Sequence, residues 1–593
     1  MMLMIIISFF ALLLYATAFT PIYNTCTGAK IGREQSTVLT STPTNELEYD
    51  AIVIGSGMSG LCAGNKLAQQ GKRVLMVESH SIPGGYTTNF YRKGFRFEIS
   101  THVMNGCGPD GAIGRILTDF GCYDKIKFKK LDTFFRWKDP ARDIDANIPI
   151  GIDAYVDTLC NIYPHEAAGI QEFHHQYYPI AAWVVEFEKR RGLNKMLYAL
   201  INLPIIAKLL ALRRRTAADI LDPLVIDPKA RELLALPANL FGLHYSELDA
   251  AVFIMASLLF HVPDSSAYYP IGGSGKVSKI LAKCFCDHGG ELCLQTHVEG
   301  IKFDDNGIAT GVVVKDKKGE STTTTAKCIV NCSDLSALVD KLCPEGTFPE
   351  SFVKKVRTHI PGRSLVAAWA GLDIDLKDYG ILDYEILHKN DISEQMRDNQ
   401  LIDEITRTAD YSILPTSIAT VYSNIDPSCC RPGKSVISTS FIASYDTFAK
   451  TLDKDGRRGS EYHELKDRIE KQLVEHMSRA TGIADLADHI EVIETATPLT
   501  FERYTDNSSG SFMGWMATPK QGAFSSFSSR TPIRNIFQCG QWLGIGGVQS
   551  VMVSGVEASN IALGYLERLE KESETKGKSE TTEKSRPALL LSV

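Results

Sequence analysis

The chain has 593 residues, of which 44% are hydrophobic and 22% charged, an ordinary balance for a globular protein. This length allows several separate domains or two large interleaved ones. The net charge of −7 argues against a nucleic-acid partner, which would call for a basic surface.

The 14 cysteines do not form a metal-binding pattern. Cys284 and Cys286 are separated by one residue and Cys429 and Cys430 are adjacent, but paired C-x-x-C motifs do not occur. We therefore expect free thiols in a reducing compartment and no metal site.

Residues 1–46 indicate a targeting sequence in two parts. The apolar run from Leu3 to Tyr15 is followed by Ala16-Thr17-Ala18, the small-x-small pattern of a signal-peptidase site. Beyond Phe19, the chain is rich in Ser and Thr and has the composition of a transit peptide. The combination resembles the signal-plus-transit presequences of algae with secondary plastids, which predicts a plastid (chloroplast) location. A retained N-terminal membrane anchor is the alternative.

The mature chain opens with the pattern of a doubly wound sheet. Residues 49–55 predict a buried strand, 59–70 a helix and 73–78 a second strand, which together form a βαβ unit. We expect an α/β fold in which a dinucleotide-binding (Rossmann-type) domain alternates along the chain with an α+β substrate domain. The first domain takes residues 47–150, 267–340 and 529–568, and the second takes a helical region at 151–266 and a mixed region at 341–528. The charged, aromatic-free residues 569–593 predict a disordered tail.

One segment of the helical region is unusually apolar. Met196 to Leu212 is almost free of charge, but it contains Pro204 and Lys208 and is too short for a confident membrane span. Basic residues flank it on both sides, which suits a helix lying in the membrane interface. A core helix of the substrate domain is an equal alternative.

The strongest motif is Gly55-Ser56-Gly57-Met58-Ser59-Gly60, placed between the first strand and its helix, with Glu78 at the end of the second strand. In this frame the glycines allow a tight turn, close approach to a diphosphate and close helix packing. The acid binds ribose hydroxyls, and the diphosphate lies on the helix N-terminus. No second motif of this kind is present for a nicotinamide cofactor.

Further motifs resemble those of the phytoene desaturase, carotenoid isomerase and retinol saturase superfamily. Pro83-Gly84-Gly85 matches the family's flavin-proximal glycine pair, and Tyr269-Pro270-Ile271-Gly272-Gly273 matches its Y-P-x-G-G segment. Thr296-His297-Val298, Asn331 to Asp334, and Gly540-Gln541 with Val548 follow in the family's order. The resemblance covers the mature chain and implies FAD, an amine-oxidase-like or GDI-like architecture, and a carotenoid or other long polyene as substrate.

Two positions depart from the family pattern. Gln541 replaces an aspartate that reaches the ribityl chain of the flavin, and it supplies a hydrogen bond without charge. Phe97-Glu98-Ile99-Ser100 replaces F-D-x-G, which lengthens the acid and removes a glycine. Glu98 and His102, four residues apart, are therefore the candidate acid–base residues. The alternatives are a structural acid and an ordinary core histidine.

The sequence favours redox-neutral chemistry on a polyene, either cis–trans isomerisation or isomerase-like hydration, at a membrane surface. A desaturase or a saturase-like reductase is the second interpretation. A non-catalytic escort related to GDP-dissociation inhibitors is the third, but such proteins lose much of the dinucleotide signature, which this chain keeps.

Overall fold

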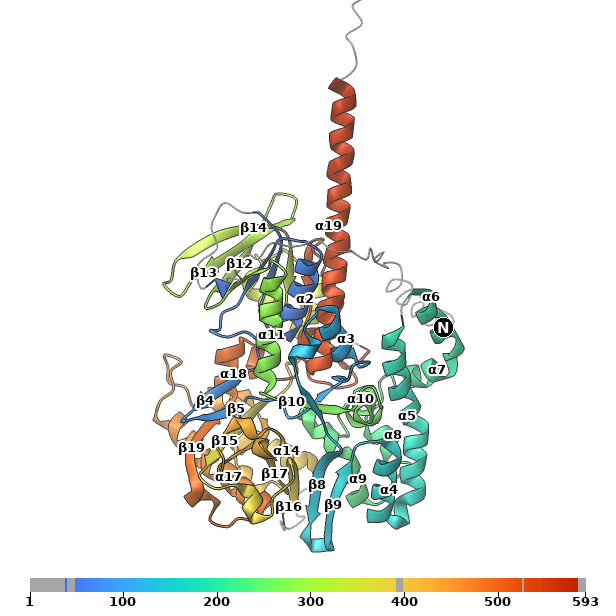
Figure 1. Ribbon diagram of the computed structural model, residues 1–593, viewed down its shortest axis with the longest axis vertical. Coiled ribbons are helices and arrows are strands. Elements are labelled where there is room, and N and C mark those ends of the chain that lie inside the picture. Colours follow the sequence, from blue (N-terminus) through green and yellow to red (C-terminus); the bar gives the residue numbers. More distant parts are fainter. Residues whose placement is uncertain are drawn as a thin grey trace, which may run out of the picture.

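The computed structural model describes residues 38–39, 48–190, 192–390, 398–524, 527–544 and 546–584. The predicted presequence thus lies outside the described residues, apart from Val38–Leu39, which form the two-residue strand β1. Two large sheets organise the chain (Figure 1).

The first sheet contains the predicted βαβ unit at its centre. Its strand order is β1-β11-β3-β2-β14-β13-β12, and β20 pairs with β14 on the same sheet. The parallel strands are β11 (Glu291–Cys293), β3 (Val74–Val77), β2 (Tyr49–Ile54), β14 (Ser321–Asn331) and β20 (Ile536–Gln538). The hairpin of β12 (His297–Phe303) and β13 (Ala309–Lys315) extends it in antiparallel fashion.

Both faces of this sheet are buried, as the alternating side chains of β2 show. Ala51 and Val53 pack with helix α2 (Met58–Gln69), α11 (Ser274–Asp287) and α19 (Val548–Lys584), whereas Ile52 and Ile54 face the opposite core. Such a strand reads as continuously hydrophobic because helices or a second layer cover each side. The expected doubly wound fold is therefore confirmed, and the strands of this sheet come from separate parts of the chain.

The second sheet has the order β19-β15-β18-β17-β16-β8-β9. Its strands are β8 (Thr133–Asp139), β9 (Ile144–Pro149), β15 (Ser364–Leu372), β16 (Glu385–Lys389), β17 (Thr416–Val421), β18 (Ser435–Ala443) and β19 (Ile490–Ala496). Neighbours are antiparallel except β16 and β8, which run parallel. Helix α17 (Ser460–Thr481) packs on one face.

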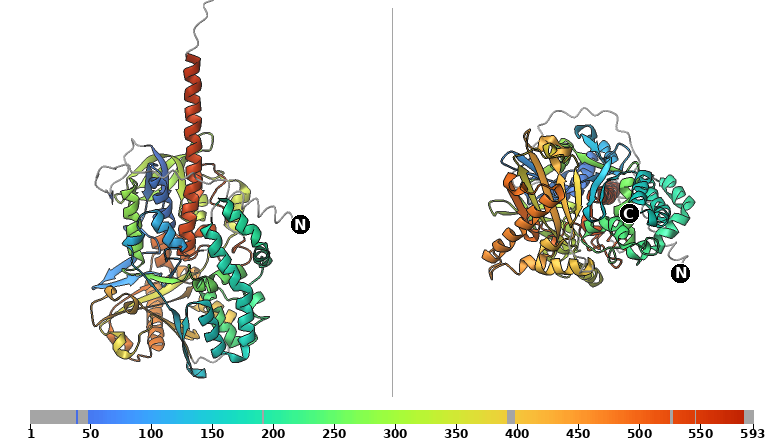
Figure 2. Two further views of the ribbon diagram at one scale, coloured as in Figure 1. Left: turned by 45° about the vertical axis from the view of Figure 1, so that its right-hand side comes forward. Right: turned by 90° about the horizontal axis from the view of Figure 1, so that it is seen from below.

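The helical region lies on the side of β8 and β9 away from β19, as Figure 2 shows from below. It contains α4 (Ile152–Ile162), α5 (Ala167–Lys189), α8 (Ala218–Leu221), α9 (Pro228–Ala235) and α10 (Ala250–Leu258). Two smaller sheets complete the fold. One is the hairpin of β4 (Asn89–Arg92) and β5 (Phe95–Glu98), and the other contains β6 (Met104–Asn105), β10 (Ala267–Pro270) and β7 (Phe128–Lys130).

Two boundaries differ from the sequence prediction. Residues 133–149 were expected in the dinucleotide domain, but they form β8 and β9 of the second sheet, because β8 pairs with β16 about 250 residues later. The expected disordered tail is instead helical as far as Lys584, since α19 continues beyond the body of the protein (Figure 1). Its Glu- and Lys-rich sequence has high helix propensity, which a compositional test for disorder does not weigh.

The apolar segment at 196–212 forms two helices rather than one. Helix α6 (Gly192–Ile201) and helix α7 (Leu203–Ala211) meet at a bend of 73°. Among the described residues no single helix is long and apolar enough to cross a membrane, although this bent pair reaches that length and composition together. Part of its apolar surface is exposed, at Leu193, Leu197, Leu200, Ile201 and Leu203, whereas Ile206 packs with Trp183 of α5 in a small core.

Candidate active site

The carboxyl ends of four parallel strands lie level with one another at one edge of the first sheet. Ile54 of β2 pairs with Val77 of β3 and with Asn331 of β14, and Asn331 pairs with Gln538 of β20. The residues that follow these strands therefore converge, although they are far apart in the sequence. Ligands of open α/β sheets bind at this edge.

The glycines in the turn after β2 have different structural roles. Gly55 has a φ of +93°, which an L side chain rarely adopts. A Cβ on Gly60 would lie 2.0 Å from the Gly55 carbonyl oxygen, so only glycine lets α2 pack this closely. A Cβ on Gly57, in contrast, would meet no protein atom within 4 Å. Gly57 therefore borders open space at the N-terminus of α2, where N–H groups and the helix dipole favour a diphosphate.

Glu78 is held against the same turn. Its carboxylate accepts hydrogen bonds from the Ser56 N–H at 2.8 Å, from the Ser56 hydroxyl at 2.7 Å and from the His80 N–H at 2.8 Å. The Gly84 N–H donates to the Ser56 carbonyl oxygen at 2.9 Å, which ties the Pro83-Gly84-Gly85 loop to the turn. Turn, acid and loop thus form one preorganised unit that fits the diphosphate and ribose of a dinucleotide.

A cavity of about 1890 Å³ begins at this unit. Most of the predicted cofactor residues line it: Gly55, Gly57, Glu78, Gly84, Gly85, Val298, Gln541 and Val548. Ser56, Ser59, Gly60 and Gly540 pack directly behind that wall. The volume exceeds the roughly 300–1,000 Å³ of an ordinary ligand pocket, so the cavity has room for a second ligand beside a dinucleotide.

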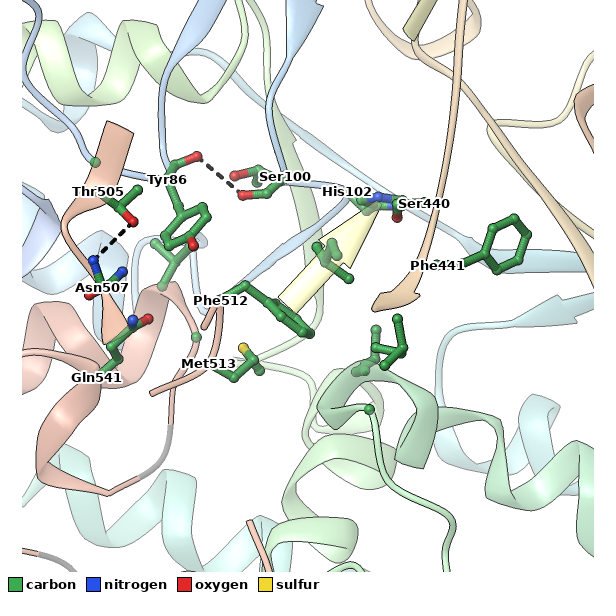
Figure 3. A pocket seen from close by; sticks show the side chains of 18 of the residues that line it. Tyr86, Ser100, His102, Ser440, Phe441, Thr505, Asn507, Phe512, Met513 and Gln541 are labelled. Atoms are coloured by element: carbon green, nitrogen blue, oxygen red, sulfur yellow. Dashed lines mark hydrogen bonds between the residues drawn. The ribbon is translucent and has the colours of Figure 1, made fainter. Parts of the chain in front are cut away.

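Beyond the dinucleotide end, the cavity continues as an arm between the second sheet and the helical region. Figure 3 shows its central part, with Tyr86, Asn507 and Gln541 on one side, Phe512 and Met513 in the middle, and His102 and Phe441 on the other. The walls of the arm are mainly apolar side chains: Phe135, Leu236, Leu240, Leu387, Ile405, Ile413, Leu414 and Ile418. Such a shape suits a long hydrocarbon chain.

Glu98 lies outside the cavity lining, in the packed interface between β5 and α11. Its carboxylate accepts hydrogen bonds from the Asn89 amide at 2.9 Å, the Tyr269 hydroxyl at 3.2 Å, and the N–H of Ser274 at 2.8 Å. Burial raises the pKa of Glu98, while the hydrogen bonds from Ser274 and its neighbours oppose that rise. With its oxygens committed in this way, Glu98 acts as a structural acid that fixes the start of α11.

His102 does line the cavity, and its ring is held from behind. Its Nδ1 lies 3.2 Å from a carboxylate oxygen of Glu385 and 3.1 Å from the hydroxyl of Thr420, which leaves Nε2 for a ligand. Burial acts to lower the pKa of His102, but the charge and hydrogen bond of Glu385 together with the charge of Glu98 outweigh it, so that pKa is raised. The Tyr384 hydroxyl also donates to the His102 carbonyl oxygen at 2.5 Å.

Glu385 is the functional residue that the sequence analysis missed. It stands at the start of β16, 283 positions from His102, and no motif marks it. The only available signal was the period-two pattern of β16, which places Glu385, Leu387 and Lys389 on one face. Pairing between β16 and β17 then sets Thr420 directly opposite Glu385.

Comparison with known proteins agrees with this geometry. The family model described as flavin containing amine oxidoreductase matches residues 58–563. The chain is 23% identical over 528 residues to all-trans-retinol 13,14-reductase of Danio rerio, covering 87% of this chain and 86% of that protein. It is 25% identical over 530 residues to the chloroplastic prolycopene isomerase 2 of an Oncidium hybrid cultivar, covering 86% and 83%.

Solved structures show the same fold at low identity. An oxidoreductase from Methanosarcina mazei matches with a TM-score of 0.54 and 14% identity, covering 86% of this chain and 99% of that one. Putrescine oxidase bound to putrescine matches with a TM-score of 0.55 and 14% identity, covering 87% and 99%. The amine-oxidase-like architecture expected from the sequence is therefore confirmed.

A charge placed at Gly57 tests the dinucleotide site. In Gly57→Glu the new Cβ meets no protein atom, but the carboxylate enters the space of the diphosphate and repels it. We expect the variant to fold and to purify without FAD, measured as the ratio of flavin absorbance to protein absorbance.

Gly459→Glu is the matched control, because Gly459 also precedes a helix and also has open space at its Cβ. This variant should keep its FAD. Stoichiometric FAD in Gly57→Glu would contradict the site.

Proposed function

The chain belongs to the flavin-containing amine oxidoreductase family and binds FAD, and on that premise we propose that it modifies a carotenoid polyene by redox-neutral chemistry. The reaction is cis–trans isomerisation or the addition of water to a double bond. The observation that carries the proposal is the His102–Glu385 pair in the wall of the cavity that begins at the dinucleotide turn. The similarity to prolycopene isomerase over 86% of the chain supports the substrate class.

In the proposed reaction the flavin and the protein make different contributions. Bound flavin supplies a conjugated ring system able to give electron density to a polyene or take it away. The protein holds that polyene extended along the apolar arm, where Leu387 and Ile418 exclude water from its length. His102 presents Nε2 to the same space and moves a proton there.

Glu385 and Thr420 position the imidazole rather than react with the substrate. Their contacts with Nδ1 fix the ring orientation, and the carboxylate stabilises the protonated form. A proton given to one carbon of a double bond creates a positive charge that the polyene delocalises. Rotation followed by return of the proton to His102 gives isomerisation. Capture by water, with loss of one proton from that water to His102, gives hydration, so neither outcome consumes electrons.

A desaturase or saturase-like reductase is the alternative within the same site, favoured by the similarity to retinol 13,14-reductase at 23% identity. It differs in its electron balance, because each product then requires one two-electron donor or acceptor. An escort without flavin chemistry has less support, since the glycine turn and Glu78 are built as a complete dinucleotide site.

We place the protein in the plastid, at a membrane surface. The sequence pattern of residues 1–46 and the chloroplastic prolycopene isomerases support the first part. The exposed apolar side chains of α6 and α7 support the second, together with Arg213 and Arg214, which are exposed at the end of α7. Of the two interpretations of this segment, we therefore propose the interfacial one.

Electron balance separates the two reaction types. With FAD reduced by a limited amount of dithionite under strict exclusion of oxygen, the proposed enzyme should form many products per electron pair supplied. Product mass should be unchanged for isomerisation, or greater by one water for hydration, as measured by mass spectrometry. A mass change of two hydrogens with one product per reductant or oxidant would establish the alternative.

The pH dependence tests the role of Glu385. Because the pKa of His102 is raised and its protonated form is the donor, turnover should be sustained at low pH and fall as pH rises through that pKa. Glu385→Gln removes the stabilising charge, so the alkaline limb should move to lower pH by about one unit or more. His102→Gln should lower kcat by roughly 10²- to 10⁴-fold.

The half-buried Glu404, paired with the exposed Arg407, provides the matched control. Glu404→Gln should leave the alkaline limb unchanged. An identical pH profile in the wild type and Glu385→Gln would exclude His102 as the titrating donor.

Liposome binding tests the membrane surface. Replacing Arg213, Arg214 and Arg215 with Gln should weaken binding to anionic vesicles about 100-fold at low salt, since each basic residue contributes roughly 1 kcal/mol. The exposed residues Lys450, Lys454 and Arg457, changed to Gln, remove the same charge elsewhere and should have little effect. Equal sedimentation of all three proteins, insensitive to salt, would refute the interfacial assignment.

A further inference from the structure

Lys389 and Glu232 form an ion pair in the lining of the apolar arm, well away from the His102–Glu385 pair. Along β16 the residues Glu385, Leu387 and Lys389 line the cavity in turn, opposite Thr420, Ile418 and Thr416 of β17. A strand rises about 3.3 Å per residue, so Lys389 lies about 13 Å beyond Glu385. The pattern along this face is polar, apolar, polar.

Helix α9 supplies the partner of Lys389. Pro228, Glu232 and Ala235 line the cavity at helical spacing, and the Glu232 carboxylate accepts a hydrogen bond from the Lys389 ammonium. The two side chains are only 21% and 15% exposed, and Lys229 of the same helix also lines the cavity. The pair is therefore largely desolvated and sits beside apolar walls, where an additional hydrogen-bonding partner is favourable.

The chemistry of this pair selects one kind of end group. An ammonium donates and a carboxylate accepts, so a hydroxyl group, which both donates and accepts, complements the two together. A hydrocarbon end would displace water from the pair without replacing its hydrogen bonds.

We propose that Lys389 and Glu232 bind the hydroxylated end group of the polyene, so that the substrate is an oxygenated carotenoid rather than a pure hydrocarbon. This inference rests on the proposed function. The contact also fixes the position of the chain along the arm, and so determines which double bond lies beside His102, because Lys389 lies about 13 Å along β16 from Glu385, the residue that holds His102. Regiospecificity thus follows from the distance between two polar pairs on one strand.

Binding of two matched ligands tests the assignment without turnover. β-Carotene and its 3,3′-dihydroxy derivative differ only in their terminal hydroxyls, and each is delivered in the same detergent micelles to the oxidised FAD-bound protein. Affinity is measured from quenching of tryptophan fluorescence. The wild type should bind the dihydroxy compound about tenfold or more tightly than the hydrocarbon.

The double variant Glu232→Leu with Lys389→Met removes both charges and leaves neither one unpaired. The affinity of this variant for the dihydroxy compound should exceed its affinity for the hydrocarbon by less than about twofold, with FAD content unchanged. The control variant Lys434→Met with Glu491→Leu removes an ion pair outside the cavity and should keep the full preference. If the double variant loses FAD, Lys389→Gln is measured in its place and should show the same loss of preference.

The outcomes separate this inference from the proposed function. Equal affinity of the wild type for both ligands, or a preference that survives removal of the pair, overturns the inference alone. Failure of the wild type to bind either polyene overturns the proposed function as well.

Discussion

The alignment of four strand ends at Ile54, Val77, Asn331 and Gln538 is the constraint on which the rest of this molecule depends. Parallel pairing fixes these ends at one edge, and everything that follows them must therefore share a small volume. The glycine turn, Glu78 and the closing segment at Gly540 occupy that volume because none of them can lie elsewhere once the strands pair. A cofactor site assembled from residues 55 to 548 is thus a consequence of sheet register.

The second sheet extends this arrangement into a long cavity. Its strand β16 pairs with β17 on one side and with β8 on the other, so it lies under the helical region rather than at a solvent-facing edge. Period-two alternation then directs Glu385, Leu387 and Lys389 into the cavity. One strand therefore supplies the residue that orients His102, an apolar contact for the chain of the substrate, and a second polar position.

Local patterns predicted the first sheet well and the second poorly. The βαβ unit and Glu78 are adjacent in sequence and carry their own signature, so their geometry followed from spacing alone. The placement of 133–149 in the second sheet and the pairing of His102 with Glu385 across 283 positions depend on contacts with no local trace. The prediction of disorder was wrong for residues 569–584 for a different reason. Composition indicates that these residues cannot form a core, but it does not measure their helix propensity.

The contrast between Glu98 and His102 shows why burial alone does not identify a reactive group. Glu98 is buried and His102 is half-buried, and their positions in the sequence gave no reason to prefer one over the other. The carboxylate of Glu98 accepts hydrogen bonds from three neighbouring residues, so its lone pairs are already used to anchor α11. The His102 ring is held through Nδ1, and the residue lines the cavity. A group held on one side and open on the other can exchange a proton with a substrate, whereas a fully satisfied group stabilises the scaffold around it.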